Sequence, residues 1–157
     1  MKKMSFLNNL YKKKKLQIVA PSENVKTAYL QRSDESLTSA KTVLSIGNLK
    51  DSVALSYYSM YHCLLALLFR VGIKCENHAA AIILLRKVFE IDNRKISKSK
   101  EERVDNQYYV GFRLEQEEAQ NSINTAEEFI TEIIEFIDKL NEQDIQHYRK
   151  KARNIIQ

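Results

Sequence analysis

The chain has 157 residues, 44% of them hydrophobic, which is enough for one domain with a sizeable core. It contains only three glycines and one proline, too few for the many turns of an all-β protein. The formal net charge is +5, and the basic residues gather in residues 1–20, 86–103 and 149–153. Such clusters suit a phosphate-rich or acidic partner, although lysines that simply keep the chain soluble would give the same pattern.

The first core helix is expected after Pro21. Residues 1–21 form a lysine-rich, weakly amphipathic extension. Ser22 can cap the helix that follows, and Gly47 can end it. Apolar side chains recur along it at helical spacing, at Val25, Ala28, Tyr29, Leu37, Ala40, Val43 and Leu44.

The second helix is expected to be buried on every side. It should begin near Asp51, run to about Arg70 and end at Gly72. Residues 56–69 carry no Asp, Glu, Lys or Arg and mix aromatic residues, small residues and leucines. A helix that is apolar all round is typical of the centre of a helical domain.

Two more helices are predicted after Gly72. One runs from about Asn77 to Phe89, and the composition of residues 92–100 then predicts a loop. The other is expected over 102–140, with an apolar seam at Ala119, Ile123, Ala126, Ile130, Ile133, Ile137 and Leu140. Because such a helix would be about 55–60 Å long at about 1.5 Å per residue, we expect a break near Gly111.

The predicted fold class is therefore all-α, an up-and-down bundle of four helices. We assign residues 1–21 to a basic N-terminal extension, 22–140 to the bundle and 141–157 to a basic C-terminal helical tail. The tail can dock on the bundle or on a second subunit.

The sequence predicts a cytoplasmic protein without a membrane segment. The apolar run 53–69 includes serines and a histidine and falls short of the roughly 20 residues that span a bilayer. The lysine-rich start lacks the apolar segment and cleavage site of a signal peptide. Cys63 and Cys75 have no second pair, so reduced thiols are expected rather than a disulfide or a metal site.

Common catalytic signatures are missing. The chain has no glycine-rich phosphate loop, nucleophile elbow or HExxH motif, and its three histidines show no ligand spacing. We therefore predict no metal and no cofactor. His62 is expected to be a hydrogen-bonded core residue, and His78 is expected to open the third helix.

One polar constellation can bind a nucleotide or RNA. An arginine near a helix N-terminus presents a fixed fork to phosphate, and a nearby tyrosine can stack on a base. Arg103 and Asn106 are expected on one face of the helix. In the alternative, Arg103 pairs with a neighbouring acid and the tyrosines lie in the core. The candidate binding residues are Arg103, Asn106, Tyr108, Tyr109, Lys98 and Lys100.

Several blocks of the chain resemble the HEPN superfamily. They are the Tyr57-Tyr58-Ser59-Met60-Tyr61-His62 stretch, Gly72 with the later His78, Arg103 followed five residues on by Tyr108, and Ala126-Glu127-Glu128-Phe129. The resemblance covers roughly residues 28–140 and is greatest to small stand-alone HEPN proteins. It implies a HEPN-like helical bundle.

The resemblance also implies a function in nucleotide or RNA chemistry. Many HEPN domains are metal-independent ribonucleases whose Arg-x(4–6)-His motif faces its copy across a dimer. Arg103 matches the arginine, but positions 108–110 are Tyr, Tyr and Val, so the acid/base histidine is absent. The branch further implies a homodimer and a small nucleotidyltransferase partner in a toxin–antitoxin-like pair, with Tyr108 or Tyr109 as a site of modification.

Three functional hypotheses follow. The first is a protein that binds nucleotide or RNA, as a homodimer and with a nucleotidyltransferase partner. The second is a ribonuclease toxin in which Arg103 neutralises the phosphate and Tyr108 replaces histidine, although a tyrosine with a pKa near 10 is a poor base at neutral pH. The third is a non-catalytic interaction scaffold.

Overall fold

A computed structural model describes residues 2–108 and 113–157. This part of the chain is almost entirely helical, as predicted, with one small antiparallel sheet. Its elements are α1 (Lys2–Lys12), β1 (Leu16–Ile18), α2 (Glu23–Ser45), α3 (Leu49–Val71), β2 (Ile73–Cys75), α4 (His78–Phe89), α5 (Arg94–Tyr108), α6 (Gln116–Asp138) and α7 (Glu142–Ile156).

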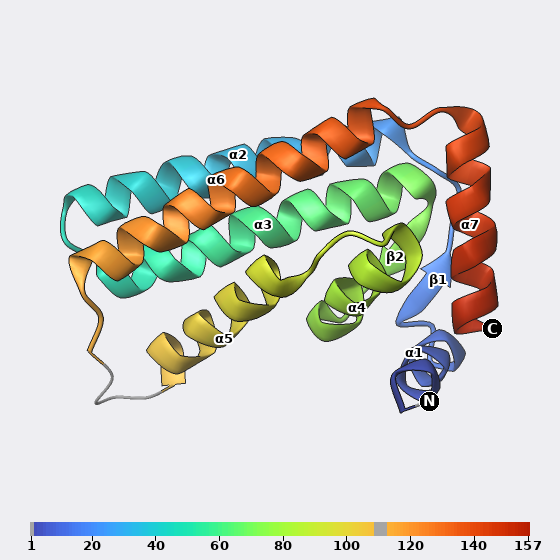
Figure 1. Cartoon of the computed structure of the whole chain (residues 1–157), viewed down its shortest axis with the longest axis horizontal. Helices are drawn as coiled ribbons and strands as arrows, with labels where there is room; N and C mark the ends of the chain where they lie inside the picture. The colour runs from blue at the N-terminus through green and yellow to red at the C-terminus, as the bar shows by residue number, and fades with distance from the viewer. Residues whose placement is uncertain (1, 109–112) are drawn as a thin grey trace.

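The four long bundle helices are α2, α3, α5 and α6. Figure 1 shows α2, α3 and α6 side by side along the long axis, with α5 next to α3. The chain direction alternates from each of these helices to the next, which is the up-and-down arrangement. The short elements α1, α4, α7 and the two strands gather at one end of the bundle, where both termini lie (Figure 1). The all-α, HEPN-like bundle predicted from the sequence is confirmed.

Helix α3 lies at the centre of the bundle. It contacts α2, α5 and α6, and Tyr57, Met60 and Leu64 are completely inaccessible to solvent. By length and composition alone it could cross a membrane, but 72% of its apolar window is buried inside the protein. The core helix of a soluble protein has these same properties. The predicted central helix is thus confirmed, but it is not buried on every side, because Ala54, Tyr58 and His62 are partly exposed.

Residues outside the four long helices contribute to the same core. Leu7 of α1, Leu16 of β1 and Ile156 of α7 are at most 1% exposed. The two strands pair antiparallel, with Leu16 opposite Cys75. They were not predicted, because three residues are too few to show a strand pattern. Cys63 and Cys75 are both buried and free.

The helix ends largely follow the predicted signals. Ser22 caps α2 and accepts a hydrogen bond from the Val25 amide at 3.1 Å. Gly72 ends α3 in the left-handed conformation. At the start of α3 the prediction was off by one turn: Asn48 is the N-cap residue, and Asp51 lies inside the first turn.

The prediction of a loop over residues 92–100 is wrong, because α5 begins at Arg94. The Asp92 carboxylate accepts a hydrogen bond from the Arg94 amide at 2.9 Å and thereby satisfies one of the free N–H groups of the first turn. Ile96 is completely buried and fixes this polar helix to the core. The helix predicted over 102–140 is broken as expected: α5 ends at Tyr108, α6 begins at Gln116, and Gly111 lies outside the described residues.

Gly72 joins three parts of the chain. Its φ of +86° is one that other residues adopt only at a cost. The Arg149 guanidinium of α7 donates hydrogen bonds to the carbonyl oxygens of Val19 at 2.6 Å and Val71 at 2.9 Å. A Cβ atom at position 72 would collide with Arg149 Nη1 and with the Val19 carbonyl oxygen.

We therefore expect Gly72→Ala to lower the free energy of unfolding by about 2–4 kcal/mol, from backbone strain plus the collision with Arg149 and Val19. Gly47 is the matched control, since its φ is +85° but a Cβ there would meet nothing within 4 Å. Gly47→Ala should cost about 1 kcal/mol. Urea unfolding of both variants measures the difference, and equal losses would contradict the role of the Arg149 contact.

Candidate functional site

Arg103 lies against the aromatic side of α3. Its Nη1 donates a hydrogen bond to the Tyr58 hydroxyl at 3.3 Å. Its guanidinium carbon is 5.3 Å from the centre of the Tyr57 ring and 5.5 Å from that of Tyr58, distances typical of cation–π contacts. These contacts hold the guanidinium of a partly buried arginine in one place, next to tyrosines that precede it by 45 residues or more.

His78 lies beside the same tyrosines. It is the first residue of α4, as predicted, and its Nδ1 is 2.7 Å from the Tyr57 hydroxyl. The Tyr61 ring stacks on it, with 3.8 Å between ring centres and 12° between planes. Burial lowers the pKa of His78, and the positive charges of Arg103 and Lys100 lower it further. The imidazole is therefore neutral at pH 7.

The tyrosines next to His78 are neutral as well. Burial raises the pKa of Tyr57 and of Tyr61, so both hydroxyls keep their protons at neutral pH. Between Tyr57 and His78, either the hydroxyl donates to Nδ1 or the protonated Nδ1 donates to the hydroxyl oxygen, depending on the tautomer. In both cases the hydrogen bond fixes the ring and leaves Nε2 for another group.

His62 extends these aromatic residues toward α2. Its ring is 6.2 Å from that of Tyr58 and 6.1 Å from that of Tyr29, and its Nδ1 lies 3.4 Å from the Ser36 hydroxyl. Burial, with a smaller effect from the Arg32 charge, lowers the pKa of His62 to about 4. His62 is hydrogen-bonded as predicted, but it is partly exposed rather than part of the closed core. We call this group the aromatic cluster: Tyr29, Tyr57, Tyr58, Tyr61, His62 and His78.

The structure divides the binding residues predicted from the sequence between two parts of the surface of α5. Arg103 faces α3, and Lys100 is close enough to His78 to influence its pKa. Asn106 and Lys98 instead line a cavity of about 660 Å³ between α5 and α6. Arg103 and Asn106 are three residues apart and lie on neighbouring parts of the helix surface, as the helical spacing predicts. Arg103 contacts Tyr58 of α3, whereas Asn106 lines the cavity toward α6.

The two tyrosines predicted for the site are not tested. Tyr108 is the last residue of α5, but its side chain is not among those described. Tyr109 lies outside the described residues. Their proposed roles in stacking, catalysis or modification remain predictions.

The sequence analysis missed the grouping of Tyr57, His78 and Arg103. These residues come from α3, α4 and α5, and no spacing rule connects them. The hydroxyl of Tyr57, in the uncharged stretch 56–69, was the signal in the sequence, since a buried tyrosine normally needs a hydrogen-bond partner. Within the described part of the chain, no group of three or more His, Cys, Asp or Glu side chains could hold a metal ion.

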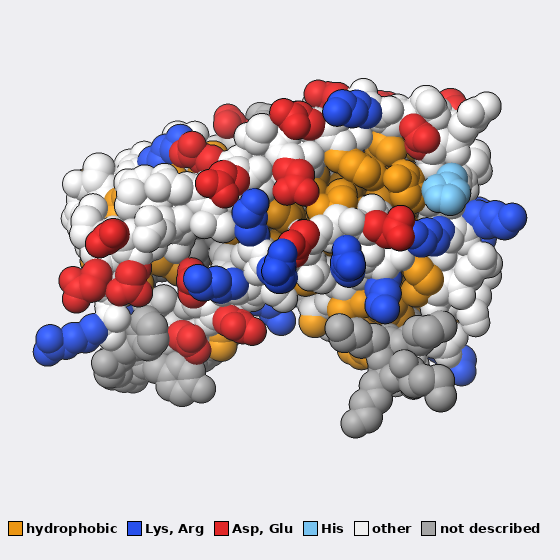
Figure 2. All heavy atoms as spheres, viewed as in Figure 1, with side chains coloured by type: hydrophobic (Ala, Val, Ile, Leu, Met, Phe, Trp, Pro, Cys, Tyr) orange, Lys and Arg blue, Asp and Glu red, His pale blue; other side chains and the backbone are white. Residues whose placement is uncertain are grey.

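The surface around α5 carries charges of both signs. Figure 2 shows lysine and arginine side chains interspersed with acidic ones, rather than one continuous basic patch. Ion pairs account for part of this pattern: Lys95 with Glu128 at 3.6 Å and Lys151 with Glu90 at 3.5 Å. Hydrophobic side chains also reach the surface next to α7 (Figure 2), where Phe136 and Tyr148 are only partly buried.

Comparison with known proteins identifies the family of the chain. The family model described as "HEPN domain" matches residues 27–157, which include Tyr57, His78 and Arg103. A UPF0332 protein of Pyrococcus horikoshii is 39% identical over 54 residues, which are 34% of this chain and 38% of that relative. The aligned part thus spans well under half the length of the curated relative. The family match covers most of the chain, including all of the four long bundle helices except the first residues of α2. HEPN domains are in general related to nucleotides or RNA. On the basis of this match, the chain belongs to the HEPN domain family.

Proposed function

We propose that this HEPN protein binds RNA or a nucleotide through Arg103, Lys100 and the exposed edge of the aromatic cluster. The observation that carries the proposal is the position of the Arg103 guanidinium, 5.3 and 5.5 Å from two tyrosine ring centres. A guanidinium that is already held by ring contacts loses little freedom when it binds a phosphate. Tyr58 and His62 are partly exposed, so the exposed part of each ring can contact a base.

The electrostatics of the cluster support an anionic ligand. Burial is the main cause of the lowered pKa of His78 and of His62, and nearby positive charges add to it: Arg103 and Lys100 at His78, and Arg32 at His62. Both imidazoles are neutral at pH 7, so they add hydrogen-bonding capacity without adding charge. A phosphate beside Arg103 would meet a fixed cation and neutral hydrogen-bonding rings, in a setting where partial burial strengthens the attraction.

We further propose that the protein acts in the cytoplasm as a homodimer, together with a small nucleotidyltransferase of the toxin–antitoxin type. The partly buried Phe136 and Tyr148 on α6 and α7 support an interface there, because hydrophobic side chains at a surface favour association. Tyr108 and Tyr109 are the candidates for modification by that partner, on the strength of their place near Arg103 in the sequence.

We expect Arg103→Ala to weaken binding of single-stranded RNA about tenfold and to reduce the slope of log Kd against log salt by about one. The loss of one phosphate contact accounts for both effects. Fluorescence anisotropy with a labelled RNA at several salt concentrations measures them. Arg153→Ala is the matched control, since Arg153 is an exposed arginine of α7. If Arg103→Ala changed neither affinity nor slope, the interaction-scaffold hypothesis would replace this one.

Ribonuclease activity is a second candidate, favoured by the position of His78. In this reaction the RNA 2′-oxygen forms a bond to the adjacent phosphorus and the bond from phosphorus to the 5′-oxygen breaks. A base takes the 2′-hydroxyl proton, and an acid protonates the leaving oxygen. His78 is a neutral imidazole at pH 7, and Arg103 is near enough to lower its pKa further. It is better suited to proton transfer at this pH than Tyr108, because the ordinary pKa of a tyrosine side chain is near 10.

The second candidate predicts RNA cleavage by the purified protein in the presence of a chelator. His78→Ala and Arg103→Ala should each lower the cleavage rate at least a hundredfold, because an acid/base group and a phosphate-binding group are lost. His147→Ala should keep the full rate, since His147 is exposed on α7. Gel analysis of a mixed RNA pool measures the rates. An unchanged rate in His78→Ala would exclude its catalytic role, and no cleavage by the unmodified protein would leave RNA binding alone.

A further inference from the structure

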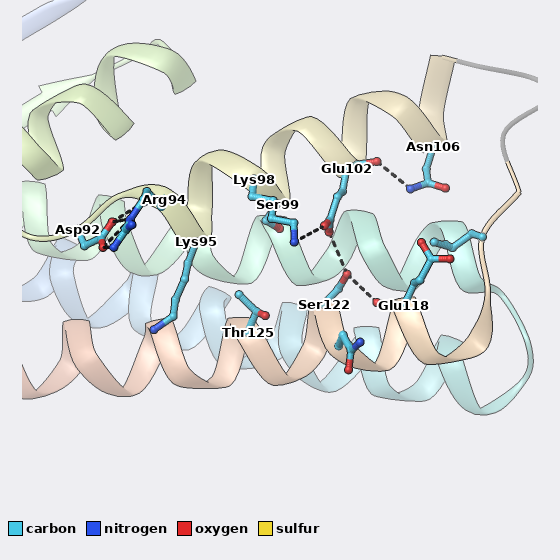
Figure 3. A pocket seen from close by; sticks show the side chains of 12 residues that line it. Asp92, Arg94, Lys95, Lys98, Ser99, Glu102, Asn106, Glu118, Ser122 and Thr125 are labelled. Carbon is cyan, nitrogen blue, oxygen red and sulfur yellow. Dashed lines mark hydrogen bonds and ion pairs between the residues drawn. The ribbon is translucent and has the colours of Figure 1, made fainter.

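The cavity between α5 and α6 is distinct from the Arg103 site. Figure 3 shows polar side chains of both helices pointing into it. Its volume of about 660 Å³ is in the range of small-molecule sites. Most helix pairs close such a gap with apolar side chains, whereas here polar residues supply the walls. Those used below are Lys95, Lys98, Ser99, Glu102 and Asn106 of α5, and Ser122 of α6.

Two buried polar atoms line this cavity without a hydrogen-bond partner among the described residues. They are Ser99 Oγ and Asn106 Oδ1, on side chains that are 3% and 5% exposed. The Asn106 amide nitrogen donates a hydrogen bond to the Glu102 carbonyl oxygen at 2.8 Å, and this contact fixes the orientation of the side-chain amide. The atom without a hydrogen-bond partner is therefore the amide oxygen, Oδ1, which is an acceptor. Buried polar atoms are normally paired, so these two positions call for a ligand that carries O–H or N–H donors.

The carboxylate between these atoms suits the same kind of ligand. Glu102 accepts a hydrogen bond from the Ser122 hydroxyl at 3.3 Å and is 38% exposed. A carboxylate has capacity for several hydrogen bonds, and hydroxyl groups of a sugar are good donors to it. Glu102, Ser99 and Asn106 lie on one side of α5 (Figure 3), so one molecule along the helix can reach all three.

The other end of the cavity carries three basic residues, Arg94, Lys95 and Lys98, and the carboxylate of Asp92, which pairs with Arg94. Lys95 lies 3.6 Å from Glu128, and Lys98 lies 3.9 Å from Glu102. Both ammonium groups are substantially exposed, and exposed ion pairs of this kind are weak. Each can therefore turn to an anion in the cavity. Lys98 and Asn106 are eight residues apart, about 12 Å along the helix axis, so the ligand must have an anionic end and a donor end separated by roughly this length.

We propose that this cavity binds a sugar phosphate, either free or as part of a nucleotide. The phosphate lies at Lys95 and Lys98, the sugar hydroxyls donate to Glu102 and Ser99, and the far end donates to Asn106 Oδ1. The site goes beyond the proposed RNA-binding function, because neither Arg103 nor Lys100 is among the residues that line the cavity. No covalent step is involved.

The test is a thermal and calorimetric titration of the full chain with ribose 5-phosphate, with uridine 5′-monophosphate and with inorganic phosphate. Either ester should raise the melting temperature by about 5–10 °C at a hundred times its Kd. Inorganic phosphate should bind at least tenfold more weakly, since it lacks the donor end. Equal affinity for the two esters identifies a sugar phosphate site, and tighter binding of the nucleotide identifies a nucleotide site; each result supports the proposal. No stabilisation by either ester overturns it.

Asn106→Leu gives the decisive comparison. Leucine has a similar size and removes the unpaired acceptor, so the variant should melt at or above the temperature of the unmodified protein without ligand. The ester should no longer stabilise it. Ser99→Ala should bind the esters more weakly and serves as the second variant if Asn106→Leu does not fold. Full ester-induced stabilisation of both variants would overturn the proposal.

The basic end is tested with Lys98→Ala, for which we expect at least a tenfold weaker Kd for the esters. Lys87→Ala is the matched control, because Lys87 is an exposed lysine of α4 that does not line the cavity. Equal effects of the two substitutions would show only general charge attraction and overturn the assigned phosphate position. The ester titration and the RNA titration use different ligands, so failure of one proposal is visible independently of the other.

Discussion

The burial of α3 is the constraint on which the rest of the structure depends. This helix has apolar or small side chains on every side, so α2, α5, α6 and the end formed by α4 and α7 must all pack around it. The same helix supplies the tyrosines that contact Arg103 and His78. Hydrophobic burial near Leu64 and Leu67 therefore fixes the positions of the tyrosine hydroxyls about two or three turns earlier. The core and the candidate site are parts of one packing arrangement.

This proximity to the core determines the chemistry of the aromatic cluster. Partial burial keeps Tyr57 and Tyr61 protonated and keeps His62 and His78 neutral at pH 7. Arg103 is then the permanently charged group among them. Under the proposed function, the low-dielectric surroundings of Arg103 would strengthen its attraction for a phosphate.

Helix α5 contributes to both candidate sites from adjacent parts of its surface. Arg103 lies against α3, and the neighbouring residues Ser99, Glu102 and Asn106 line the polar cavity against α6. Ile96 is completely buried and fixes the helix to the core. A helix with so few apolar residues has little packing of its own, which explains why its first part resembled a loop in the sequence.

The bundle could be predicted from the sequence because its signals are local. The spacing of apolar residues, the Ser22 cap and the Gly72 terminus each depend on neighbouring positions, and all three are found as expected. The start of α5 could not be predicted, because it depends on one buried isoleucine and on the Asp92 contact. The candidate site was predicted only in part. Arg103 was predicted as a binding residue, but its grouping with Tyr57 and His78 follows from packing between three helices. The cavity that Asn106 lines depends on how α5 packs against α6.

The order of the helices along the chain has a consequence for how the protein is made. α3 is complete at Val71, but α6, which covers one of its sides, ends only at Asp138. At about 5–20 residues per second, a ribosome needs several seconds to produce the intervening chain. During that time the most hydrophobic helix of the protein has only α2 to pack against, together with whatever part of α4 and α5 has emerged. The nascent chain is therefore most exposed to aggregation, and most dependent on chaperones, in the interval between the synthesis of α3 and that of α6.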